Sequence, residues 1–396
     1  MKSEWKVKKI GDVVDIRRGA SPRPIHKFLS NKGMPWVKIA DATSDNSRFI
    51  RKTNECIINE GIKKSVMVTP ETLIVSNSAT PGLPKIMKIN ACVHDGWLVF
   101  SNYKGITRDF LYYKFIDVRR NLVNQANGSV FQNLKTDIVR EFDINIPSIN
   151  TQNKIVSMLS KIDEKIELNE KINKNLQLQA QTLFIAWFET FEPFDGVVPD
   201  SWKQITLGDI AEIKTNSFNP QKNPDVLIEH YSIPAFDENK YPVFEYSSGV
   251  KSNKYILSNN SVMISKLNPD TKRVWRPLCL SDFAVSSTEF IIFEPYNPKY
   301  KDYVYSIIDS QGFTDWMCSH TTGSTNSRQR TTPATTLNYN LWMPDDESIK
   351  KFLNAVTPMY DLISQNLCQN QELVSLRDSL LPKLMSGELD VSNIDI

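Results

Sequence analysis

Side chains that could carry out acid–base, nucleophilic or metal chemistry are sparse in this sequence and poorly spaced for it. The 4 histidines and 5 cysteines stand apart and form no CxxC or comparable ligand pair. The GxGxxG, GxxxxGK[ST] and HExxH patterns, which hold dinucleotides, phosphates and zinc, are missing from the sequence. Asp345 and Asp346 adjoin a helical pattern, where solvated residues at a helix start are a simpler interpretation than a general acid and base. We therefore predict no catalytic residue, no bound cofactor and no metal site in this chain.

Lysine and arginine side chains, by contrast, gather where they could contact phosphates. Residues 1–147 contain 24 Lys and Arg against 14 Asp and Glu, a net charge of +10, whereas residues 193–344 contain 14 against 16, a net charge of −2. In the second segment the basic residues gather in SKLNPDTKRVWRP (265–277) and NSRQR (326–330). A positive excess of this size attracts polyanions. The first segment is thus a candidate polyanion-binding module, and the second offers local patches for phosphates.

The elements that must position these residues occur twice, at a shift of 197 residues. EWKVKKIGDVVDI (4–16) aligns with SWKQITLGDIAEI (201–213), and FDINIP ending at Pro147 aligns with YNLWMP ending at Pro344. Each half begins with short β-like runs broken by Pro, Gly, Asn and Ser, and it ends with a helical pattern. The prediction is an α+β fold with a pseudo-twofold internal repeat. Its segments are an α/β module over 1–147, a helix over 148–192, a second α/β module over 193–344, and a helix with a tail over 345–396.

A heptad pattern follows each β-rich segment. Apolar residues recur at alternating intervals of four and three over 155–187 and 352–384, which is typical of a coiled-coil seam. Each helix would be about 50 Å long, and the two most simply bury their stripes against each other as an antiparallel pair. Pro358 lies inside the second stripe, so we expect that helix to bend near its beginning or to begin at about Thr357.

Four asparagines interrupt the two apolar stripes. In the antiparallel pairing, residues whose numbers sum to 539 face each other, so Asn169 faces Asn370 and Asn173 faces Asn366. A buried layer of this kind lowers stability but penalises slipped pairings, in which the asparagines would face apolar residues. We expect this layer to set the register of the helix pair.

The sequence also carries signals of cellular location. No apolar run approaches the ~18 residues of a membrane span, and the first residues, MKSEWKVKKIGD, have no apolar core of a signal peptide. Scattered cysteines suggest reduced thiols rather than a disulfide framework. We therefore expect a cytoplasmic protein.

Several stretches carry a resemblance to a known family. They are IPSINTQNKIVSMLSKIDEKIELNEKINKNLQ, WKQITLGDIAEIKTN, YSIPAFDENKYP, SKLNPDTKRVW, SSTEFIIF and LRDSLLPKLMSGELDV. In their order, and with the 197-residue repeat, they resemble the specificity subunit of type I restriction-modification systems. The resemblance covers essentially the whole chain, although the second helix lacks the glutamine that the first has in TQNKI.

The resemblance implies a subunit that does no chemistry itself. Each module would be a target recognition domain reading one half of a bipartite, asymmetric site in double-stranded DNA, and the helices would set the distance between the halves. Two modification (methyltransferase) subunits, carrying S-adenosylmethionine, would dock along the helices. Restriction (endonuclease and translocase) subunits would join them.

The same resemblance implies that loops of each module enter the DNA grooves, where phosphate contacts fix the register and base contacts specify the sequence. In the first module we expect DNA contacts from Arg17, Arg18, Ser21, Arg23, Lys38, Ser76, Asn77, Ser78, Ser129 and Gln132. In the second we expect them from Lys214, Asn216, Lys266, Asn268, Lys272, Arg273, Arg276, Ser324, Asn326, Arg328, Gln329 and Arg330.

Other functions remain open at this point. One is the specificity subunit of a related type II (IIB-like) methyltransferase-nuclease. Another is a stand-alone methyltransferase or a fused nuclease-methyltransferase, which needs a cofactor motif, and none of the Asn-Pro dipeptides reads as the Asn-Pro-Pro-aromatic loop of adenine methyltransferases. A third is a coiled-coil scaffold that joins two protein-binding modules without nucleic acid, against which the charge of the first module argues.

Overall fold

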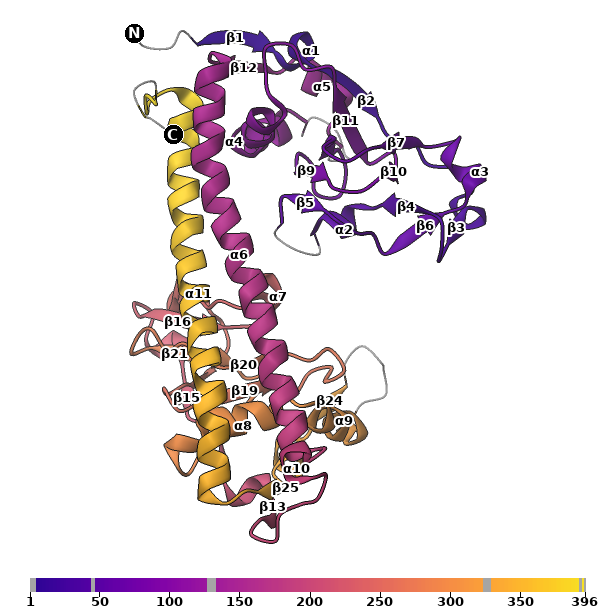
Figure 1. Ribbon diagram of the computed structural model, residues 1–396. Coiled ribbons are helices and arrows are strands. Elements are labelled where there is room, and N and C mark those ends of the chain that lie inside the picture. The colour runs from indigo at the N-terminus through magenta and orange to yellow at the C-terminus, as the bar shows by residue number, and fades with distance from the viewer. Residues whose placement is uncertain (1–4, 44–46, 127–132, 323–328, 392–393, 395–396) are drawn as a thin grey trace. The chain divides into compact units, whose positions relative to one another are not determined.

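The chain forms two compact units, each with a β-rich segment and one end of two long helices. The computed structural model describes residues 5–43, 47–126, 133–322, 329–391 and 394. One unit is Met1–Glu167 with Leu373–Ile396, and the other is Leu168–Glu372. The long helices, α6 (Ile149–Phe188) and α11 (Asp346–Ser386), contribute to both units and lie side by side (Figure 1). Of the helices in these ranges, none is both long and apolar enough to cross a membrane.

In its described residues, the first unit contains twelve named strands and five short or medium helices besides the ends of α6 and α11. Its strands are β1 (Lys6–Lys9), β2 (Asp15–Arg18), β3 (Leu29–Ser30), β4 (Met34–Val37), β5 (Phe49–Ile50), β6 (Glu55–Ile57), β7 (Val66–Val68), β8 (Leu73–Ser76), β9 (Pro84–Met87), β10 (Ala91–Val93), β11 (Trp97–Ser101) and β12 (Asp143–Ile146). Its helices are α1 (Ile10–Val13), α2 (Ile39–Thr43), α3 (Asn59–Ile62), α4 (Arg108–Ala126) and α5 (Thr136–Arg140), with the 3-10 turn η1 (Ile25–Lys27).

The second unit has a similar inventory. Its strands are β13 (Lys203–Thr206), β14 (Ala211–Lys214), β15 (Ser217–Phe218), β16 (Leu227–Tyr231), β17 (Val243–Tyr246), β18 (Lys254–Ile256), β19 (Val262–Ser265), β20 (Val274–Trp275), β21 (Ala284–Ser287), β22 (Phe290–Pro295), β23 (Thr321–Thr322), β24 (Arg330–Thr331) and β25 (Asn340–Met343). Its helices are α7 (Ile233–Asn239), α8 (Lys301–Ile308), α9 (Gln311–Ser319) and α10 (Pro333–Thr336). The 3-10 turns are η2 (Glu192–Phe194), η3 (Leu207–Asp209), η4 (Pro220–Lys222), η5 (Ser247–Gly249) and η6 (Pro298–Tyr300).

The two units repeat one strand order. The first contains the antiparallel run β2-β11-β8-β9 and the second the run β14-β22-β19-β20. A second sheet contains β6-β4-β10-β7 in the first unit and β17-β16-β21-β18 in the other, and in each the two middle strands are parallel. The small ribbon β1-β12 likewise corresponds to β13-β25. The predicted α+β fold with an internal repeat is confirmed at the level of strand order.

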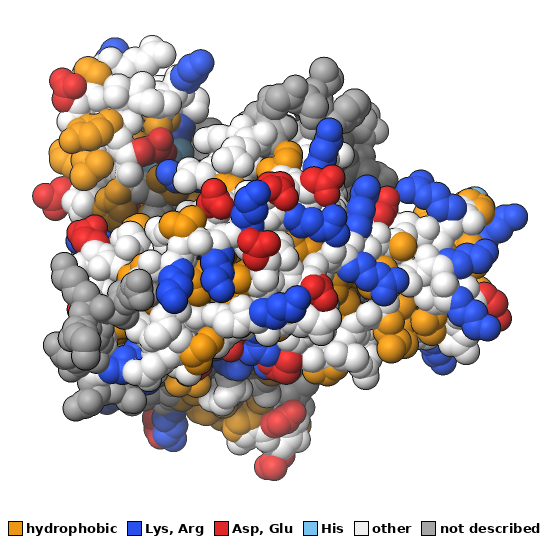
Figure 2. Space-filling model, turned by 90° about the horizontal axis from the view of Figure 1, so that it is seen from above, with side chains coloured by type: hydrophobic (Ala, Val, Ile, Leu, Met, Phe, Trp, Pro, Cys, Tyr) orange, Lys and Arg blue, Asp and Glu red, His pale blue; other side chains and the backbone are white. Residues whose placement is uncertain are grey.

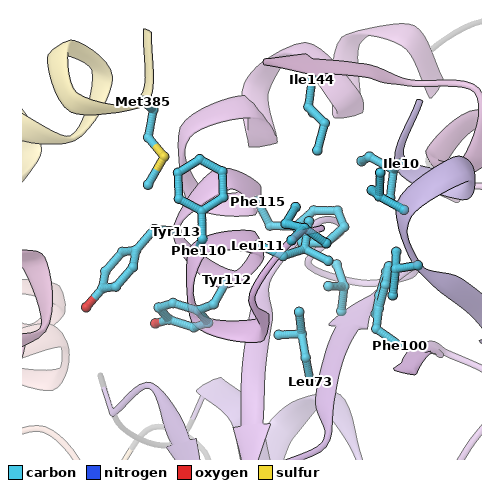
Figure 3. Close-up of a cluster of buried hydrophobic side chains, with 14 of the residues drawn as sticks. Ile10, Leu73, Phe100, Phe110, Leu111, Tyr112, Tyr113, Phe115, Ile144 and Met385 are labelled. Atoms are coloured by element: carbon cyan, nitrogen blue, oxygen red, sulfur yellow. The ribbon is translucent and has the colours of Figure 1, made fainter. Parts of the chain in front are cut away.

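The core of the first unit is built around α4, the segment between the last sheet strand and the ribbon. Phe110, Leu111 and Phe115 are fully buried on this helix. They belong to one apolar cluster with Phe100 of β11 and Met385 of α11 (Figure 3). Burying side chains of this size contributes about 2–3 kcal/mol each, so α4 holds the sheet and the long helices as one body within this unit.

In the first unit, a buried polar contact explains why Arg377 interrupts the apolar stripe of α11. Its guanidinium donates to Asp163 of α6 at 3.0 Å, and the Tyr113 hydroxyl of α4 donates to the same carboxylate at 2.6 Å. Asp163 is 8% exposed. A buried carboxylate needs such partners because its desolvation is otherwise costly.

Aromatic side chains join the long helices to the second module. Phe184 and Phe188 of α6 pack against Phe352 of α11, and the Phe188 and Phe352 rings meet edge to face with centroids 4.8 Å apart. Phe188 also meets Tyr303 of α8 at 5.1 Å. In both units the early residues of one long helix therefore pack against the late residues of the other, as the predicted antiparallel pair requires.

The second long helix begins earlier than one of our expectations placed it. It runs without a break from Asp346, so the beginning expected near Thr357 is wrong, and Pro358 lies inside the helix. Asp345 caps the helix by accepting a hydrogen bond from the Ser348 backbone N–H at 2.8 Å. The cap and the burial of the apolar face in the first turns offset the roughly 3 kcal/mol cost of an internal proline.

Candidate nucleic-acid interface

Four residues predicted to contact DNA come together in the first unit around an aspartate that the sequence reasoning missed. Asp95 lies in the turn between β10 and β11, and its carboxylate accepts hydrogen bonds from the Ser21 hydroxyl at 2.6 Å and the Arg23 guanidinium at 3.3 Å. Its backbone carbonyl accepts from Arg18 Nε at 2.9 Å and from Asn77 Nδ2 at 3.0 Å. We call these five residues the Asp95 cluster. Chain segments far apart in sequence thus present their polar side chains at one place.

The Asp95 cluster combines an ionised carboxylate with two exposed arginines. The hydrogen bond from Ser21 and the nearby charge of Arg23 lower the pKa of Asp95, so its carboxylate is ionised at neutral pH. The side chains of Arg18 and Arg23 are 60% and 79% exposed. Two exposed guanidiniums around one carboxylate leave a net positive charge, which suits a phosphate backbone.

A hollow of about 930 Å³ adjoins the Asp95 cluster. Lys38 also lies on it, where its ammonium is 2.5 Å from a Glu55 carboxylate oxygen. The floor includes Trp36, which is 2% exposed and thus belongs mainly to the core. The lining residues are Ser21, Pro22, Arg23, Pro24, Ile25, His26, Trp36, Lys38, Ile39, Ala40, Ser78, Ala79 and His94.

The remaining residues predicted for the first module have different surroundings. Ser76 is fully buried, and its hydroxyl accepts a hydrogen bond from the Leu83 backbone N–H at 3.0 Å, so it stabilises a turn. Arg17 is exposed on β2. Ser129 and Gln132 lie outside the described residues.

Acidic residues are interspersed with the basic ones on the molecular surface. Figure 2 shows Lys and Arg side chains spread over the face drawn there, with Asp and Glu side chains among them. Lys9 with Glu141 and Arg140 with Asp137 are exposed examples of such pairs in the first unit. Contacts with a polyanion must therefore be argued residue by residue rather than from one uniform patch.

The two basic stretches of the second module lie next to each other. The backbone N–H of Asn268 donates to the Gln329 carbonyl at 2.9 Å, and the N–H of Thr331 donates to the Lys266 carbonyl at 3.1 Å. Leu267 and Arg330 form an isolated antiparallel bridge. The segments around 266–268 and 329–331 thus form one surface site, although about 60 residues separate them in the chain.

Most of the basic side chains predicted for the second module already have acidic partners. Arg276, the clearest case, binds Asp302 at 2.7 Å and Asp361 of α11 at 2.8 Å, and its side chain is only 16% exposed. Lys266 has no ion-pair partner in the described part of the chain, and Asn216 is exposed. The other pairs are Lys214 with Glu212, Lys272 with Asp309, Arg273 with Asp237, and Arg330 with Glu289. Ser324, Asn326 and Arg328 lie outside the described residues.

The four asparagines of the helix stripes are in contact in the second unit. Asn169 Nδ2 donates to Asn370 Oδ1 and to Gln369 Oε1, each at 2.8 Å, and Asn366 Nδ2 donates to Asn173 Oδ1 at 2.7 Å. Asn169 is fully buried. The facing pairs are those whose numbers sum to 539, and Gln369, which lies outside the heptad stripe, is a partner that the pattern could not show.

The sequence reasoning also missed a repeated arginine contact between each module and its long helix. Arg48 binds Glu164 of α6 at 3.0 Å, and Arg276 binds Asp361 of α11 at 2.8 Å. Glu164 and Asp361 are separated by the 197-residue shift. Comparing the two helix repeats could have found the matching acidic positions but not the arginines that bind them, and we call the two contacts the arginine clamps.

Among the residues with assigned positions, no group of three or more His, Cys, Asp or Glu is placed to hold a metal ion. The arrangement consists of hydrogen-bond donors, cations and a hollow, which can bind a ligand by contact.

The chain is similar to known proteins over almost its whole length. Residues 2–178 match the family described as type I restriction modification DNA specificity domain. The chain is 27% identical over 417 residues to the specificity subunit of the type I restriction enzyme MjaIX from Methanocaldococcus jannaschii, covering 99% of this chain and 95% of that protein. It is 20% identical over 472 residues to the HindI specificity subunit of Haemophilus influenzae, covering 98% and 100%.

A solved structure shares the fold. The type I restriction-modification S subunit of M. genitalium superposes with a TM-score of 0.59 at 16% identity, over 97% of this chain and 96% of that one. With the repeated strand order and the paired long helices, these matches show that the chain is similar to type I restriction-modification specificity subunits in sequence, and to the M. genitalium S subunit in fold.

Proposed function

We propose that this chain binds a bipartite, asymmetric site in double-stranded DNA, with each module reading one half. The observation that carries the proposal is the duplicated module with different side chains at equivalent places. The Asp95 cluster lies in turns at the ends of strands of the first module. The site formed by 266–268 and 329–331 lies at the ends of equivalent strands of the second. Two frameworks of one design with divergent contact residues suit two different half-sites.

The proposed contact residues differ in how readily they can reach DNA. In the first module, Arg18, Ser21, Arg23 and Asn77 lie together. In the second, Lys272 and Arg276 are held by buried acids and are weaker candidates than Lys266. The other residues named from the sequence remain proposed contacts, whereas Ser76 and Asn77 are buried and are weak candidates for direct contact.

The long helices are proposed to fix the distance between the two half-sites and to dock two modification subunits. The buried asparagine contacts support this, because a polar layer fixes the register of paired helices at some cost in stability. The chain itself is proposed to be non-catalytic. Within such a complex, S-adenosylmethionine belongs to the modification subunits and DNA cleavage to the restriction subunits.

The proposal is tested by titrating duplex DNA with the chain assembled with its modification subunits at several salt concentrations. We expect affinity to fall steeply with salt, and a preference for duplexes that contain both halves of one site. Mapping methylated adenines in a host that carries the locus would show the motif as two specified parts with a fixed gap. Binding with neither salt dependence nor a two-part preference would contradict the proposal and favour a protein scaffold.

A further inference from the structure

One turn occupies the same structural position in both modules. Asn77 directly follows β8, and Lys266 directly follows the equivalent strand β19. The backbone N–H of Asn77 donates to the Gly96 carbonyl at 2.8 Å, and that of Lys266 donates to the Glu289 carbonyl at 2.9 Å. Gly96 ends the turn before β11 and Glu289 ends the turn before β22. The backbone framework is therefore shared at this point.

The side chains of the two turns differ, but each turn contains an acidic residue that is bound by an arginine. In the first module Asp95 is held by Arg23 at 3.3 Å, and in the second Glu289 is held by Arg330 at 3.0 Å. With Gly96 matched to Glu289, Asp95 corresponds to Thr288 and His94 corresponds to Ser287, so the acidic residue stands one position later in the second module. A shared backbone with exchanged side chains is what two readers of different sequences require.

His94 is held in one orientation in this turn. Its Nδ1 accepts a hydrogen bond from the Gly96 backbone N–H at 2.8 Å. An accepting Nδ1 carries no proton, so the proton of the neutral ring is on Nε2. The ring packs between Trp36 and Trp97, with centroid distances of 6.1 and 6.4 Å, and its side chain is 19% exposed.

The His94 side chain borders the hollow beside the Asp95 cluster. His94 lines that hollow together with Arg23 and Lys38. Among the residues whose positions are described, none accepts a hydrogen bond from Nε2. Burial in this place lowers the pKa of His94, so the ring stays neutral at physiological pH. A neutral ring has little electrostatic attraction for phosphate, and its remaining polar atom is a single fixed donor.

We infer that His94 is a specificity-determining residue of the first module, donating from Nε2 to an acceptor on the major-groove edge of a base in its half-site. The inference rests on the proposed DNA-binding function. Purines offer N7 as an acceptor there and thymine offers O4, whereas cytosine offers only the donor N4–H₂. A fixed donor therefore rejects cytosine at the position that it reads.

Two substitutions distinguish the donor role of His94 Nε2 from the structural role of His94 Nδ1. His94→Asn keeps an oxygen near the place of Nδ1, where it can accept from Gly96, but removes the donor at Nε2. His94→Gln keeps an amide donor near the place of Nε2. Each variant is assembled with the modification subunits, and its binding to the site is measured in competition with duplexes that carry single base substitutions.

We expect His94→Asn to lose about tenfold discrimination against cytosine at one position of one half-site. His94→Gln should keep most of that discrimination, and the other half-site should be unchanged for both. His320→Ala, a histidine substitution in the second module, should leave the profile of the first half-site unchanged. The melting temperature of each variant is measured beside the wild type.

The inference fails if His94→Asn keeps the wild-type binding profile or weakens binding to all substituted duplexes equally. It also fails if the two variants lose the same discrimination at the same position. In that case the wild-type complex would still show its two-part preference, which separates this failure from failure of the proposed function. If His94→Asn does not fold, wild-type protein is tested on duplexes in which single bases lack one major-groove acceptor, such as 7-deazapurines. A first half-site insensitive to every acceptor deletion would overturn the assignment.

Discussion

Asp95 positions the cationic side chains of the first module while partly neutralising them. It binds Arg23 through its carboxylate and Arg18 through its backbone carbonyl. Holding a long side chain in place reduces the conformational entropy that is lost on binding. The carboxylate also repels phosphate. The Asp95 carboxylate therefore orders the arginines for a defined contact, although it lowers the affinity for DNA of any sequence.

Asp95→Asn should raise affinity for DNA of random sequence, because it removes the repulsive charge but keeps an oxygen that can accept from Ser21. We expect affinity to rise about two- to fivefold at low salt, with the salt slope steeper by up to about 0.9. Titrations at several salt concentrations measure both quantities. Glu60→Gln, the same charge change at an exposed site in this unit, is the control. An equal effect of both substitutions would mean that only the net charge matters.

The buried histidines predict how stability depends on pH. Burial lowers the pKa of His94, with Asp95 and Asp41 opposing and Lys38 reinforcing the shift, and burial likewise lowers that of His230 against Glu245. An unfolded histidine has a pKa of about 6.5. Below that pH the unfolded chain binds more protons than the folded one, so stability falls until the folded pKa is passed.

Melting temperatures measured from pH 7.5 to 5 should therefore fall in the wild type. The decline should be smaller in His94→Asn, which cannot titrate at that position. A variant that declines as steeply as the wild type would show that His94 does not contribute to the pH dependence.

At the scale of elements, each module is fastened to a long helix by an arginine clamp. Arg48 with Glu164 and Arg276 with Asp361 occupy corresponding helix positions. If a module could pivot on its helix, the distance between the two half-sites, which the helices are proposed to fix, would vary. The clamps are thus positioning contacts for the proposed function.

Arg276→Ala should lower the free energy of unfolding by about 2–3 kcal/mol, because it leaves the buried carboxylate of Asp302 without its cation. Arg273→Ala is a matched control. Its partner Asp237 is half exposed, so the loss should be about 1 kcal/mol. Chemical denaturation measures both. Unchanged stability of Arg276→Ala with weakened DNA binding would instead make Arg276 a contact residue.

The asparagine layer makes a separate prediction. Asn169 Oδ1 has no hydrogen-bond partner in the described part of the structure, which indicates that the layer is not optimised for stability. Replacing Asn169, Asn173, Asn366 and Asn370 by Leu should raise the free energy of unfolding by about 2 kcal/mol. The gap in the methylated motif should become variable as the register loosens. A fixed gap with a monodisperse monomer would remove the register role.

The features that could be predicted from the sequence were those encoded by the heptad periodicity and the internal repeat. The stripes and their sum rule predicted that Asn169 faces Asn370, because a heptad seam fixes which residues meet. The strand order repeated as the shared segments indicated. Asp95 and His94 escaped prediction because their roles depend on tertiary contacts with Ser21 and Gly96, which no local pattern encodes. Likewise, nothing in the local sequence of Arg276 reveals that Asp361 of α11 binds it.

At the scale of the whole molecule, the duplicated plan separates the residues that are proposed to contact DNA bases from the helices that are proposed to set the spacing. The modules differ in the residues around equivalent turns, whereas the helices share the asparagines and the clamp positions. If the proposed function holds, substitutions in the DNA-contacting turns can therefore accumulate without altering the helices that set the spacing. This separation predicts that the gap between half-sites can be changed without changing the bases that are read.

A heptad inserted into both helices tests that separation. The insertions lie between Asn169 and Asn173 in α6 and between Asn366 and Asn370 in α11, so that they face each other in the antiparallel pair. Seven residues add about 10 Å, equal to about three base pairs at 3.4 Å each. We expect a methylated motif with the same two parts and a gap longer by about three base pairs, or loss of methylation because the second half-site has rotated around the duplex. Insertion into one helix alone should break the pairing and lower the melting temperature. A motif with its original gap after the paired insertion would show that the helices do not set the spacing.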